Sequence, residues 1–271
     1  MPQHDLIVIP ARYGSTRLPG KPLVTIAGRT LLERVVAVAR QASRLAGMTE
    51  FVVATDDPRI EAHANSLGCE TIITSTEISS GSGRAYAAAR ARNVRPNIVV
   101  NLQGDAPFIE PATIARLIEA ARSTTAAVAT PVTRMTWTEL DRLRGHKIRA
   151  PFSGTTCIRA PDGRALWFSK AIVPAIRNEA LLRQTSDISP VFQHLGLYAY
   201  RYQALEEFER TPPSHYEQLE GLEQLRLLEM GLDILTVEVP SPRHAVSGID
   251  TTEDVELAEA LIAQLGDPYI P

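Results

Sequence analysis

The first loop of the chain combines three cationic side chains with two glycines. An apolar run leads into this loop, which carries Arg12, Arg17 and Lys21 together with Gly14 and Gly20. Glycine allows backbone N–H groups to point inward, while guanidinium and ammonium groups neutralise an anion. The loop therefore predicts a cradle for a polyphosphate, and a nucleoside triphosphate is the anion that we expect.

The same loop is not a Walker A motif. Five residues separate Gly14 from the Gly20-Lys21 pair, where that motif has four, and Pro22 stands where a Ser or Thr would hold magnesium. The spacing thus argues against a mononucleotide kinase or a P-loop ATPase.

Two carboxylates are candidate metal ligands. Asp105 follows an apolar run at 98–102, which places it just past a buried strand, where open α/β sheets bind ligands. Because a triphosphate needs a hard divalent cation, we interpret Asp105 as a metal ligand in preference to a turn residue. Asp250 is the second candidate. Thr251 and Asp254 form a capping-box pattern beside it, so helix capping explains that motif equally well.

Short β-rich runs alternate with helical patterns along the chain. The predicted strands are residues 6–9, 51–54, 98–102, 126–132 and 235–239. Such alternation is typical of an α/β protein with a mostly parallel sheet covered by helices. We expect a single domain over residues 1–271.

Two helix starts are well signalled. Thr30 and Glu33 form a capping-box pattern ahead of an apolar stripe. Asp57 is a suitable N-cap, with a proline at the first helical position and Gly68 at the end. We therefore interpret Asp56 and Asp57 as structural.

The segment at about 145–190 breaks the alternation with four prolines. We expect it to pair off the main sheet and to act as a lid or a dimerisation arm. Strand character resumes at 195–200, and residues 216–230 predict one helix with a leucine stripe. The stripe consists of Leu219, Leu222, Leu225 and Leu228.

Composition limits the possible partners. The chain has 271 residues, 44% of them apolar and 22% charged, and a net charge of −3, which argues against nucleic-acid binding. No apolar run reaches the roughly 20 residues that span a bilayer. Cys69 and Cys157 have no paired spacing. We expect a cytoplasmic protein with reduced thiols, no membrane insertion and a small anionic ligand.

Six motifs extend over nearly the whole chain. They are IPARYGSTRLPGKP (9–22), VATDD (53–57), NLQGD (101–105), HLGLYAYR (194–201), LEQLR (222–226) and GIDTTED (248–254). Together they resemble the sugar-acid cytidylyltransferases, most closely the 3-deoxy-manno-octulosonate (Kdo) cytidylyltransferase family. This resemblance implies a Rossmann-like, GT-A-like nucleotidyltransferase fold, a three-layer sandwich with a smaller inserted segment, and a homodimer. It also implies Mg²⁺-dependent transfer of CMP from CTP to the anomeric 2-hydroxyl of a sugar acid, with release of pyrophosphate, for lipopolysaccharide or capsule assembly.

The resemblance assigns roles to individual residues. The implied catalytic set is Arg12, Lys21, Asp105 and Asp250, of which the two aspartates would bind the metal. The implied nucleotide-binding set is Ala11, Arg12, Gly14, Ser15, Arg17, Lys21, Ser80, Gly81, Arg84 and Gln103. The implied sugar-binding set is Lys170, His194, Tyr198, Glu217 and Gln218. Spacing alone favours His194 as a strand-end histidine satisfied by backbone partners, and only the resemblance places it at the substrate.

Four positions depart from the family pattern, mainly in the acceptor half. Gly83 stands where the family commonly has an acidic residue, Ala106 where it has Glu, Thr156 where it has Lys and Lys170 where it has Arg. Lysine presents a point charge where arginine can grip a carboxylate in two places. The acceptor therefore stays open between Kdo, its 8-amino form, another ulosonic acid and a different anionic molecule.

Two other functions stay open. The first is a nucleotidyltransferase that activates a sugar phosphate or a phosphonate, for which a basic cluster is available: Lys147, Arg149, Arg159 and Arg164. The second is a non-catalytic nucleotide-sensing protein, which would keep the loop but make no use of Asp105 and Asp250.

Overall fold

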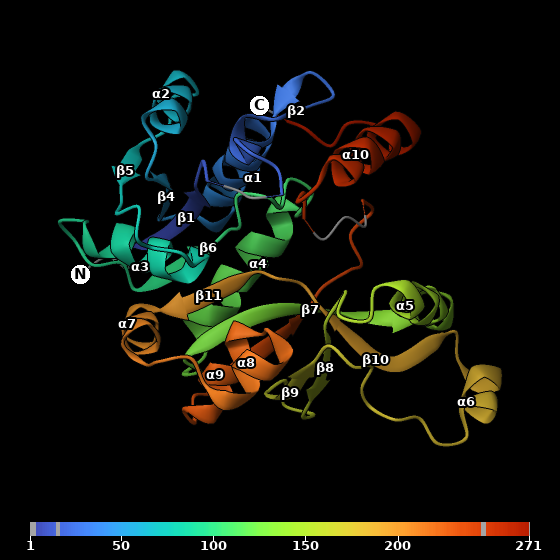
Figure 1. Ribbon diagram of the computed structural model, residues 1–271. Coiled ribbons are helices and arrows are strands. Elements are labelled where there is room, and N and C mark those ends of the chain that lie inside the picture. Colours follow the sequence, from blue (N-terminus) through green and yellow to red (C-terminus); the bar gives the residue numbers. More distant parts are fainter. Residues whose placement is uncertain (1–3, 15–16, 245–247, 271) are drawn as a thin grey trace. The chain divides into compact units, whose positions relative to one another are not determined.

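The computed structural model describes residues 4–14, 17–244 and 248–270 and divides the chain into two compact units (Figure 1). The first unit comprises residues 1–123, 197–209 and 242–271, and the second comprises residues 124–196 and 210–241. The segment at about 145–190 lies wholly in the second unit. Its role as a lid or dimerisation arm within one domain stays a prediction.

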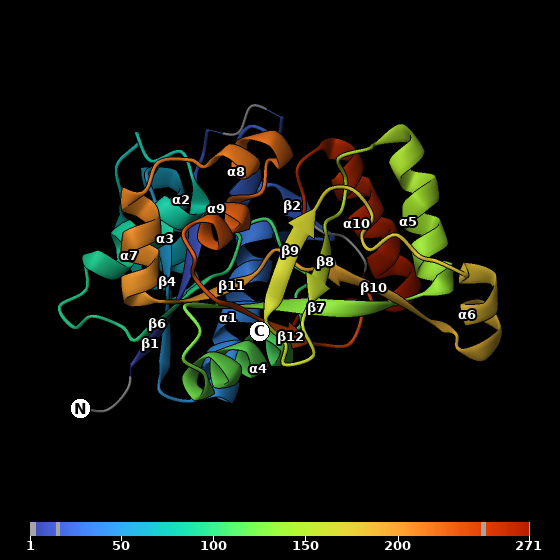
Figure 2. The ribbon, with the colours of Figure 1, turned by 90° about the horizontal axis from the view of Figure 1, so that it is seen from below.

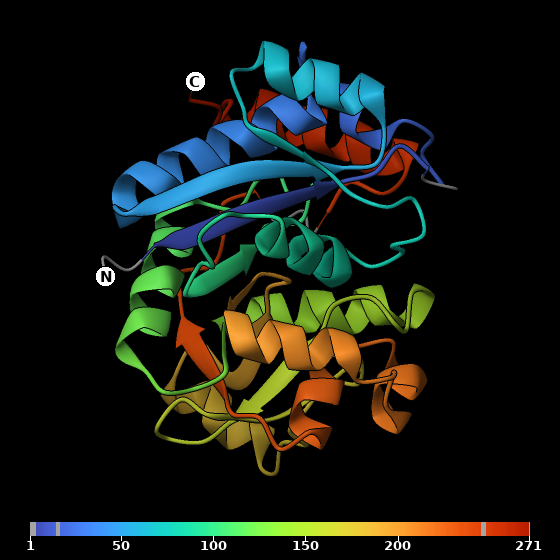
Figure 3. The same cartoon turned by 90° about the vertical axis from the view of Figure 1, so that its left-hand side faces the viewer.

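The first unit is built on a mainly parallel sheet. Its strand order is β5 (Thr71–Ile73), β4 (Thr49–Thr55), β1 (Asp5–Ala11), β6 (Ile98–Asn101) and β11 (Tyr198–Arg201). The first four are parallel and β11 is antiparallel to β6. Figure 3 shows β1 and β4, in blue, side by side. The apolar run 6–9 within β1 is fully buried, as expected for a strand covered on both faces. The predicted α/β class with a mainly parallel central sheet is confirmed.

Helices and two short strands complete the first unit. They are η1 (Lys21–Leu23), β2 (Thr25–Ile26), β3 (Arg29–Thr30), α1 (Leu31–Ala46), α2 (Pro58–Ser66), α3 (Gly81–Arg90), α4 (Pro111–Ser123), α7 (Tyr202–Arg210), whose last residue falls to the second unit, and α10 (Thr252–Leu265). The Thr30 hydroxyl accepts from the Glu33 N–H, so half of the predicted capping box forms. The Glu33 carboxylate accepts from Arg29 instead of closing the box. Asp57 caps α2 and Gly68 follows its end with a φ of 69°, as predicted.

The second unit has its own strand set (Figure 2). The order is β12 (Ile234–Glu238), β7 (Val128–Thr136), β10 (Ile188–His194), β8 (Thr156–Arg159) and β9 (Ala165–Ser169). Its helices are α5 (Trp137–Arg149), α6 (Glu179–Thr185), α8 (His215–Glu220) and α9 (Glu223–Glu229). We expected the segment at about 145–190 to pair off the main sheet, and this is wrong for β8 and β9. They continue the sheet of their own unit because β10 pairs with β7 on one edge and β8 on the other.

The predicted strands are confirmed, but the predicted helix over 216–230 is wrong. The chain forms α8 and α9 instead, separated by Gly221 at a φ of 64° and by Leu222. A left-handed residue ends an α-helix, and glycine adopts that conformation without a side-chain clash. As a result Leu219 is 64% exposed, and Leu227 is buried in place of Leu228.

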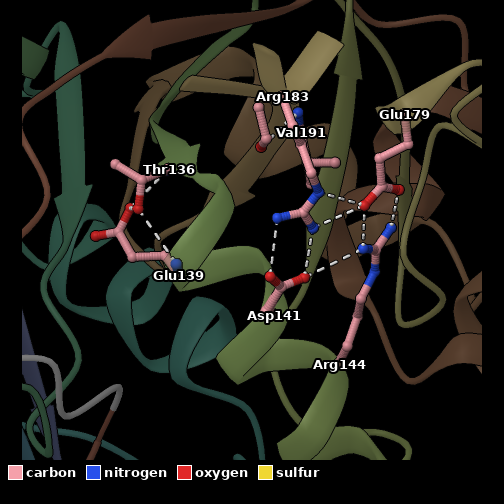
Figure 4. A network of polar contacts seen from close by, with 8 residues as sticks. Thr136, Glu139, Asp141, Arg144, Glu179, Arg183 and Val191 are labelled. Atoms are coloured by element: carbon pink, nitrogen blue, oxygen red, sulfur yellow. Dashed lines mark hydrogen bonds and ion pairs between the residues drawn. The ribbon is translucent and has the colours of Figure 1, made fainter. Parts of the chain in front are cut away.

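None of the residues of helix α6 is buried, and ion pairs connect the helix to α5 (Figure 4). Arg144 of α5 donates two hydrogen bonds of 2.8 Å to the Glu179 carboxylate. Arg183 bonds both Glu179 and Asp141, at 2.7 Å each. First Arg144 and then Arg183 lower the pKa of Glu179 to about 2. The two arginines therefore attach α6 to α5.

Two smaller findings concern the whole described chain. No helix within the described residues has the length and apolar character needed to cross a membrane. Cys69 and Cys157 are both buried, and neither forms a disulfide.

Candidate functional site

A cavity of about 300 Å³ lies beyond the C-terminal ends of β1 and β6 in the first unit. Loops that follow parallel strands meet at this edge of a sheet, which is the usual ligand site of open α/β folds. The lining residues are Pro10, Ala11, Arg12, Arg17, Lys21, Pro22, Ser79, Ser80, Gly81, Arg84, Gln103, Gly104, Asp105 and Asp250. The cavity therefore combines cations, carboxylates and small polar groups.

Most of the predicted nucleotide-side residues meet in this cavity. All four predicted catalytic residues line it, and so do the predicted nucleotide-binding residues except two. Gly14 does not line the cavity, and Ser15 lies outside the described residues. The roles of these residues stay predictions. The sequence interpretation missed Pro10, Pro22, Ser79 and Gly104.

Lys21 joins the two predicted metal ligands. Its Nζ donates to Asp105 Oδ2 at 2.7 Å and to Asp250 Oδ1 at 3.0 Å. Arg17 Nη2 lies 3.1 Å from the other oxygen, Asp250 Oδ2. The two carboxylates thus converge on one point and are neutralised by residues of the first loop.

The helix after Asp250 is capped by residues other than Asp250. Thr251 is the N-cap of α10, and its capping box with Asp254 is complete. The Asp254 carboxylate also accepts from the Asp250 N–H at 2.9 Å. Capping is therefore done by Thr251 and Asp254, which leaves the Asp250 side chain for the cavity.

Close backbone approach explains Gly104. A Cβ at this position would lie 2.4 Å from the carbonyl oxygen of Pro10, a distance that no real Cβ contact shows. The end of β1 and the loop after β6 can therefore approach each other only with glycine here. A glycine directly before a predicted ligand aspartate was the available signal. Gly81 is under a weaker limit, because its Cβ would lie 3.0 Å from Gln103 Oε1, a side-chain atom.

Arg84 is buried and has several partners. It is 2% exposed, donates to Asp56 Oδ2 at 2.8 Å and to the Ile78 carbonyl at 3.0 Å, and also bonds the Thr74 hydroxyl. The structural interpretation of Asp56 stays a prediction, supported by its ion pair with Arg84. Arg84 still lines the cavity, and its predicted role in nucleotide binding stays a prediction.

His194, a predicted sugar ligand, is buried in the second unit. Its Nε2 lies 2.8 Å from the Thr130 hydroxyl, and its ring packs edge-on against Phe168. Burial, and then the positive charge of Lys170, lowers the pKa of His194 to about 3. The imidazole is therefore neutral at physiological pH.

Lys170 lies on a segment that Glu220 and Lys147 hold. Its N–H donates to Glu220 Oε2 at 2.5 Å, and its carbonyl accepts from Lys147 Nζ at 2.6 Å. Burial lowers the pKa of Lys170, and the nearby Glu220 carboxylate opposes this shift. Lys170 is thus a partly desolvated cation in a fixed segment.

The other predicted sugar ligands have partners of their own. The Glu217 carboxylate accepts from Arg226 at 2.5 and 2.7 Å and from the Ser214 N–H at 2.9 Å. Gln218 is exposed and donates to the Pro213 carbonyl. Tyr198, in the first unit, is buried against the Tyr200 ring. Their contact with a sugar stays a prediction.

Three of the departures from the family pattern have physical consequences. A Cβ on Gly83 would lie 2.9 Å from Glu209 Oε2, so a carboxylate from α7 already lies beside this position. Ala106 is buried. The Thr156 hydroxyl donates to the Ala171 carbonyl at 2.8 Å and so serves the protein interior.

The basic cluster suggested for a phosphorylated acceptor is partly committed elsewhere. Lys147 Nζ is surrounded by backbone carbonyls, including those of Ser153 and Gly154. Arg159 pairs with Glu238 at 3.1 Å. These contacts weaken the case for a phosphate site there.

Comparison with known proteins identifies the family. The cytidylyltransferase family model matches residues 6–234. The 3-deoxy-manno-octulosonate cytidylyltransferase of Maricaulis maris (strain MCS10) is 38% identical over 263 residues, which is 97% of this chain and 98% of that protein. The protein of the same name from Anaeromyxobacter dehalogenans (strain 2CP-C) is 39% identical over 262 residues, 96% of this chain and 98% of that protein.

Solved structures give the same result. A CMP:2-keto-3-deoxy-manno-octonic acid synthetase complexed with CTP matches with a TM-score of 0.81 and 35% identity, covering 97% of this chain and all of that one. A 4-diphosphocytidyl-2C-methyl-D-erythritol synthase from Anaerococcus prevotii DSM 20548, at 12% identity and a TM-score of 0.59, covers 96% of this chain and 99% of that one and shares the fold alone. The family model matches most of this chain, the relatives match it over nearly their full length, and a cation-lined cavity lies at the sheet edge. This chain therefore belongs to the cytidylyltransferase family.

Proposed function

We propose that this protein transfers CMP from CTP to Kdo, or to a closely related 3-deoxy-ulosonic acid, and releases pyrophosphate. The observation that carries the proposal is the cavity of the first unit, where three loop cations and two carboxylates meet around one space. The choice of acceptor is supported by the relatives named above, because both carry the name of the Kdo enzyme. The choice of nucleotide is supported by the synthetase structure, which is a complex with CTP.

The reaction is a direct displacement. The anomeric 2-hydroxyl oxygen of the acid forms a bond to the α-phosphorus of CTP, the bond from that phosphorus to the bridging α,β-oxygen breaks, and pyrophosphate leaves while the hydroxyl proton passes to solvent. Such a step needs positioning and charge stabilisation more than covalent chemistry. Arg12, Arg17 and Lys21 supply three positive charges for the triphosphate.

Asp105 and Asp250 fit a magnesium ion. Within the described residues no group of three or more acidic, histidine or cysteine side chains could hold a metal. Mg²⁺ is commonly bound by one or two carboxylates together with substrate phosphates, so a converging pair suffices. When bound, the ion would offset phosphate charge during transfer.

We place the binding of the acceptor acid in the second unit. Lys170 would attract the sugar carboxylate, with His194, Glu217 and Gln218 as further polar groups of the same unit. Lysine at position 170 favours a test of modified acids alongside Kdo, because its single ammonium grips a carboxylate less specifically than arginine does.

We further propose a cytoplasmic homodimer that serves lipopolysaccharide synthesis. Exposed apolar side chains of the second unit support the dimer: Ile148 is 85% exposed, Phe152 72% and Leu181 59%. Light scattering of the purified protein and of Phe152→Ser tests this. A monomeric wild type would contradict it.

Pyrophosphate release tests the reaction. The purified protein is incubated with CTP and Mg²⁺ plus Kdo, 8-amino-Kdo, a nine-carbon ulosonic acid or a phosphonate, with UTP and ATP as nucleotide controls. We expect release with CTP and one 3-deoxy-ulosonic acid. Release with the phosphonate alone would show that the acceptor is a phosphonate and not a sugar acid. CTP binding without release for any acceptor would favour a nucleotide-sensing protein.

A further inference from the structure

One ammonium group bonds both carboxylates that would hold the metal. Lys21 Nζ lies 2.7 Å from Asp105 Oδ2 and 3.0 Å from Asp250 Oδ1. Only 16% of the Lys21 side chain is exposed, against 26% for Asp105 and 37% for Asp250. The charge of Lys21 is therefore directed at these two oxygens and not at solvent.

The backbone fixes Lys21 in this position. Gly20 adopts a φ of 66° at the start of η1, and its carbonyl accepts from the Leu23 N–H at 2.8 Å. The Lys21 N–H donates to the Leu18 carbonyl at 3.1 Å, and the Gly20 N–H donates to the Tyr13 carbonyl at 3.2 Å. The side chain thus extends from a rigid turn toward the carboxylates.

Arg17 reinforces the arrangement. It lies 3.1 Å from the Asp250 oxygen that Lys21 does not contact. Both oxygens of Asp250 are then occupied by cations of the first loop. The proposed function also assigns Arg17 and Lys21 to the binding of the triphosphate.

A divalent ion and this ammonium compete for the same two carboxylates. Mg²⁺ needs oxygen ligands at about 2.0–2.1 Å in near-octahedral geometry, and here Asp105 Oδ2 and both oxygens of Asp250 already face a positive charge. An Mg²⁺ ion bound to these oxygens would lie close to the Lys21 ammonium, and the two positive charges would repel each other strongly. A triphosphate would offer Lys21 and Arg17 another anion and would thereby free the carboxylates.

We propose that Lys21 is the counter-cation of Asp105 and Asp250 in the nucleotide-free protein, so that a divalent ion binds these carboxylates well only once a nucleotide triphosphate has drawn Lys21 away. The proposal rests on the proposed nucleotide site. It makes the affinities for metal and nucleotide mutually enhancing, since such coupling is reciprocal. Lys21 thereby sets the order of binding as well as contacting phosphate.

Metal binding without any acceptor tests the proposal. Free Mn²⁺ is followed by electron paramagnetic resonance during titration of the full-length protein, with and without a non-hydrolysable CTP analogue. We compare wild type with Lys21→Met, which removes the charge at similar length, and with Lys21→Arg, which keeps it. Arg12→Met is the matched control, because Arg12 lines the same cavity but forms no ion pair with either aspartate among the described residues.

The expected pattern is specific. Wild type should bind Mn²⁺ about 10-fold or more tightly with the analogue than without it, a coupling typical of linked sites. Without nucleotide, Lys21→Met should bind Mn²⁺ about 10-fold more tightly than wild type, whereas the Mn²⁺ affinities of Lys21→Arg and Arg12→Met should differ from wild type by less than about 3-fold. The proposal is overturned if Lys21→Met gains no metal affinity, or if Arg12→Met gains as much. Circular dichroism of each variant excludes misfolding. Failure of the proposed function would instead appear as absent pyrophosphate release, with this binding pattern intact.

Discussion

The backbone N–H of Ile249 donates a hydrogen bond of 2.9 Å to the carbonyl oxygen of Asp105. Ile249 is fully buried, so this bond is protected from water and anchors the loop that carries Asp250 beside the loop that carries Asp105. The main chain therefore holds together two carboxylates whose charges alone would separate them. Their convergence on Lys21 follows from this contact.

The first prediction concerns Asp105→Asn. The change removes a negative charge proposed to hold the metal but leaves the loop cations in place, so turnover should fall about 100-fold or more, while CTP affinity measured without Mg²⁺ should change less than about 5-fold. Pyrophosphate release and calorimetric titration with CTP measure the two effects. Glu256→Gln, an exposed carboxylate on α10, is the control and should match wild type. Unchanged turnover in Asp105→Asn would remove this aspartate from the reaction.

The second prediction concerns Gly104→Ala. The new Cβ would clash with the Pro10 carbonyl oxygen, so the loop after β6 must move, at a cost of about 1–3 kcal/mol in the free energy of unfolding. CTP affinity should also fall because the cavity lining moves. Gly145→Ala is the matched control: a Cβ there has no neighbour within 4 Å, and it lies inside α5, so stability should rise by about 0.5–1 kcal/mol. Urea unfolding compares them, and equal stability of the two variants would refute the steric argument.

The third prediction concerns pH and His194. The folded-state pKa is about 3, below the ordinary value of 6.5, so the unfolded chain binds a proton that the folded chain excludes. The contribution of the neutral His194 to the free energy of unfolding is therefore fully present above pH 6.5 and falls by about 1.4 kcal/mol per pH unit below it, until pH approaches 3. Trp137 and Trp167 both lie in the second unit, so tryptophan fluorescence during urea unfolding reports on it. His194→Gln cannot take up the proton and should show a slope smaller by this amount. Equal slopes would contradict the prediction.

The fourth prediction concerns the attachment of α6. Glu179→Gln removes the carboxylate that receives Arg144 and Arg183, and α6 buries no side chain that could replace this contact. Amide hydrogen exchange in residues 179–185 should accelerate about two- to five-fold, with little change in global stability, since exposed ion pairs act locally. Arg142→Gln, an exposed change on α5, should leave that exchange unaltered. Acceleration spread evenly over the second unit would argue against a local role.

Local patterns determined much of this protein from the sequence alone. The strand at 98–102 and the cap at Asp57 depend on neighbours within a few residues, and both were predicted correctly. The glycine-containing loop with Lys21 and the aspartate after β6 were recognisable as site candidates from residue type and strand position, and Lys21 and Asp105 both line the cavity. These features need no information about distant segments.

Long-range packing decided the rest. Nothing local shows that Glu217 pairs with Arg226, or that the chain turns at Gly221 instead of continuing one helix. Likewise, the 2.4 Å limit at Gly104 exists only because β1 ends beside it, and Lys21 meets Asp105 and Asp250 only because three loops converge. Hydrophobic periodicity specifies which face of an element is buried, but the partner of each charged group depends on which segments the fold brings within a few ångströms, and only the tertiary structure specifies that.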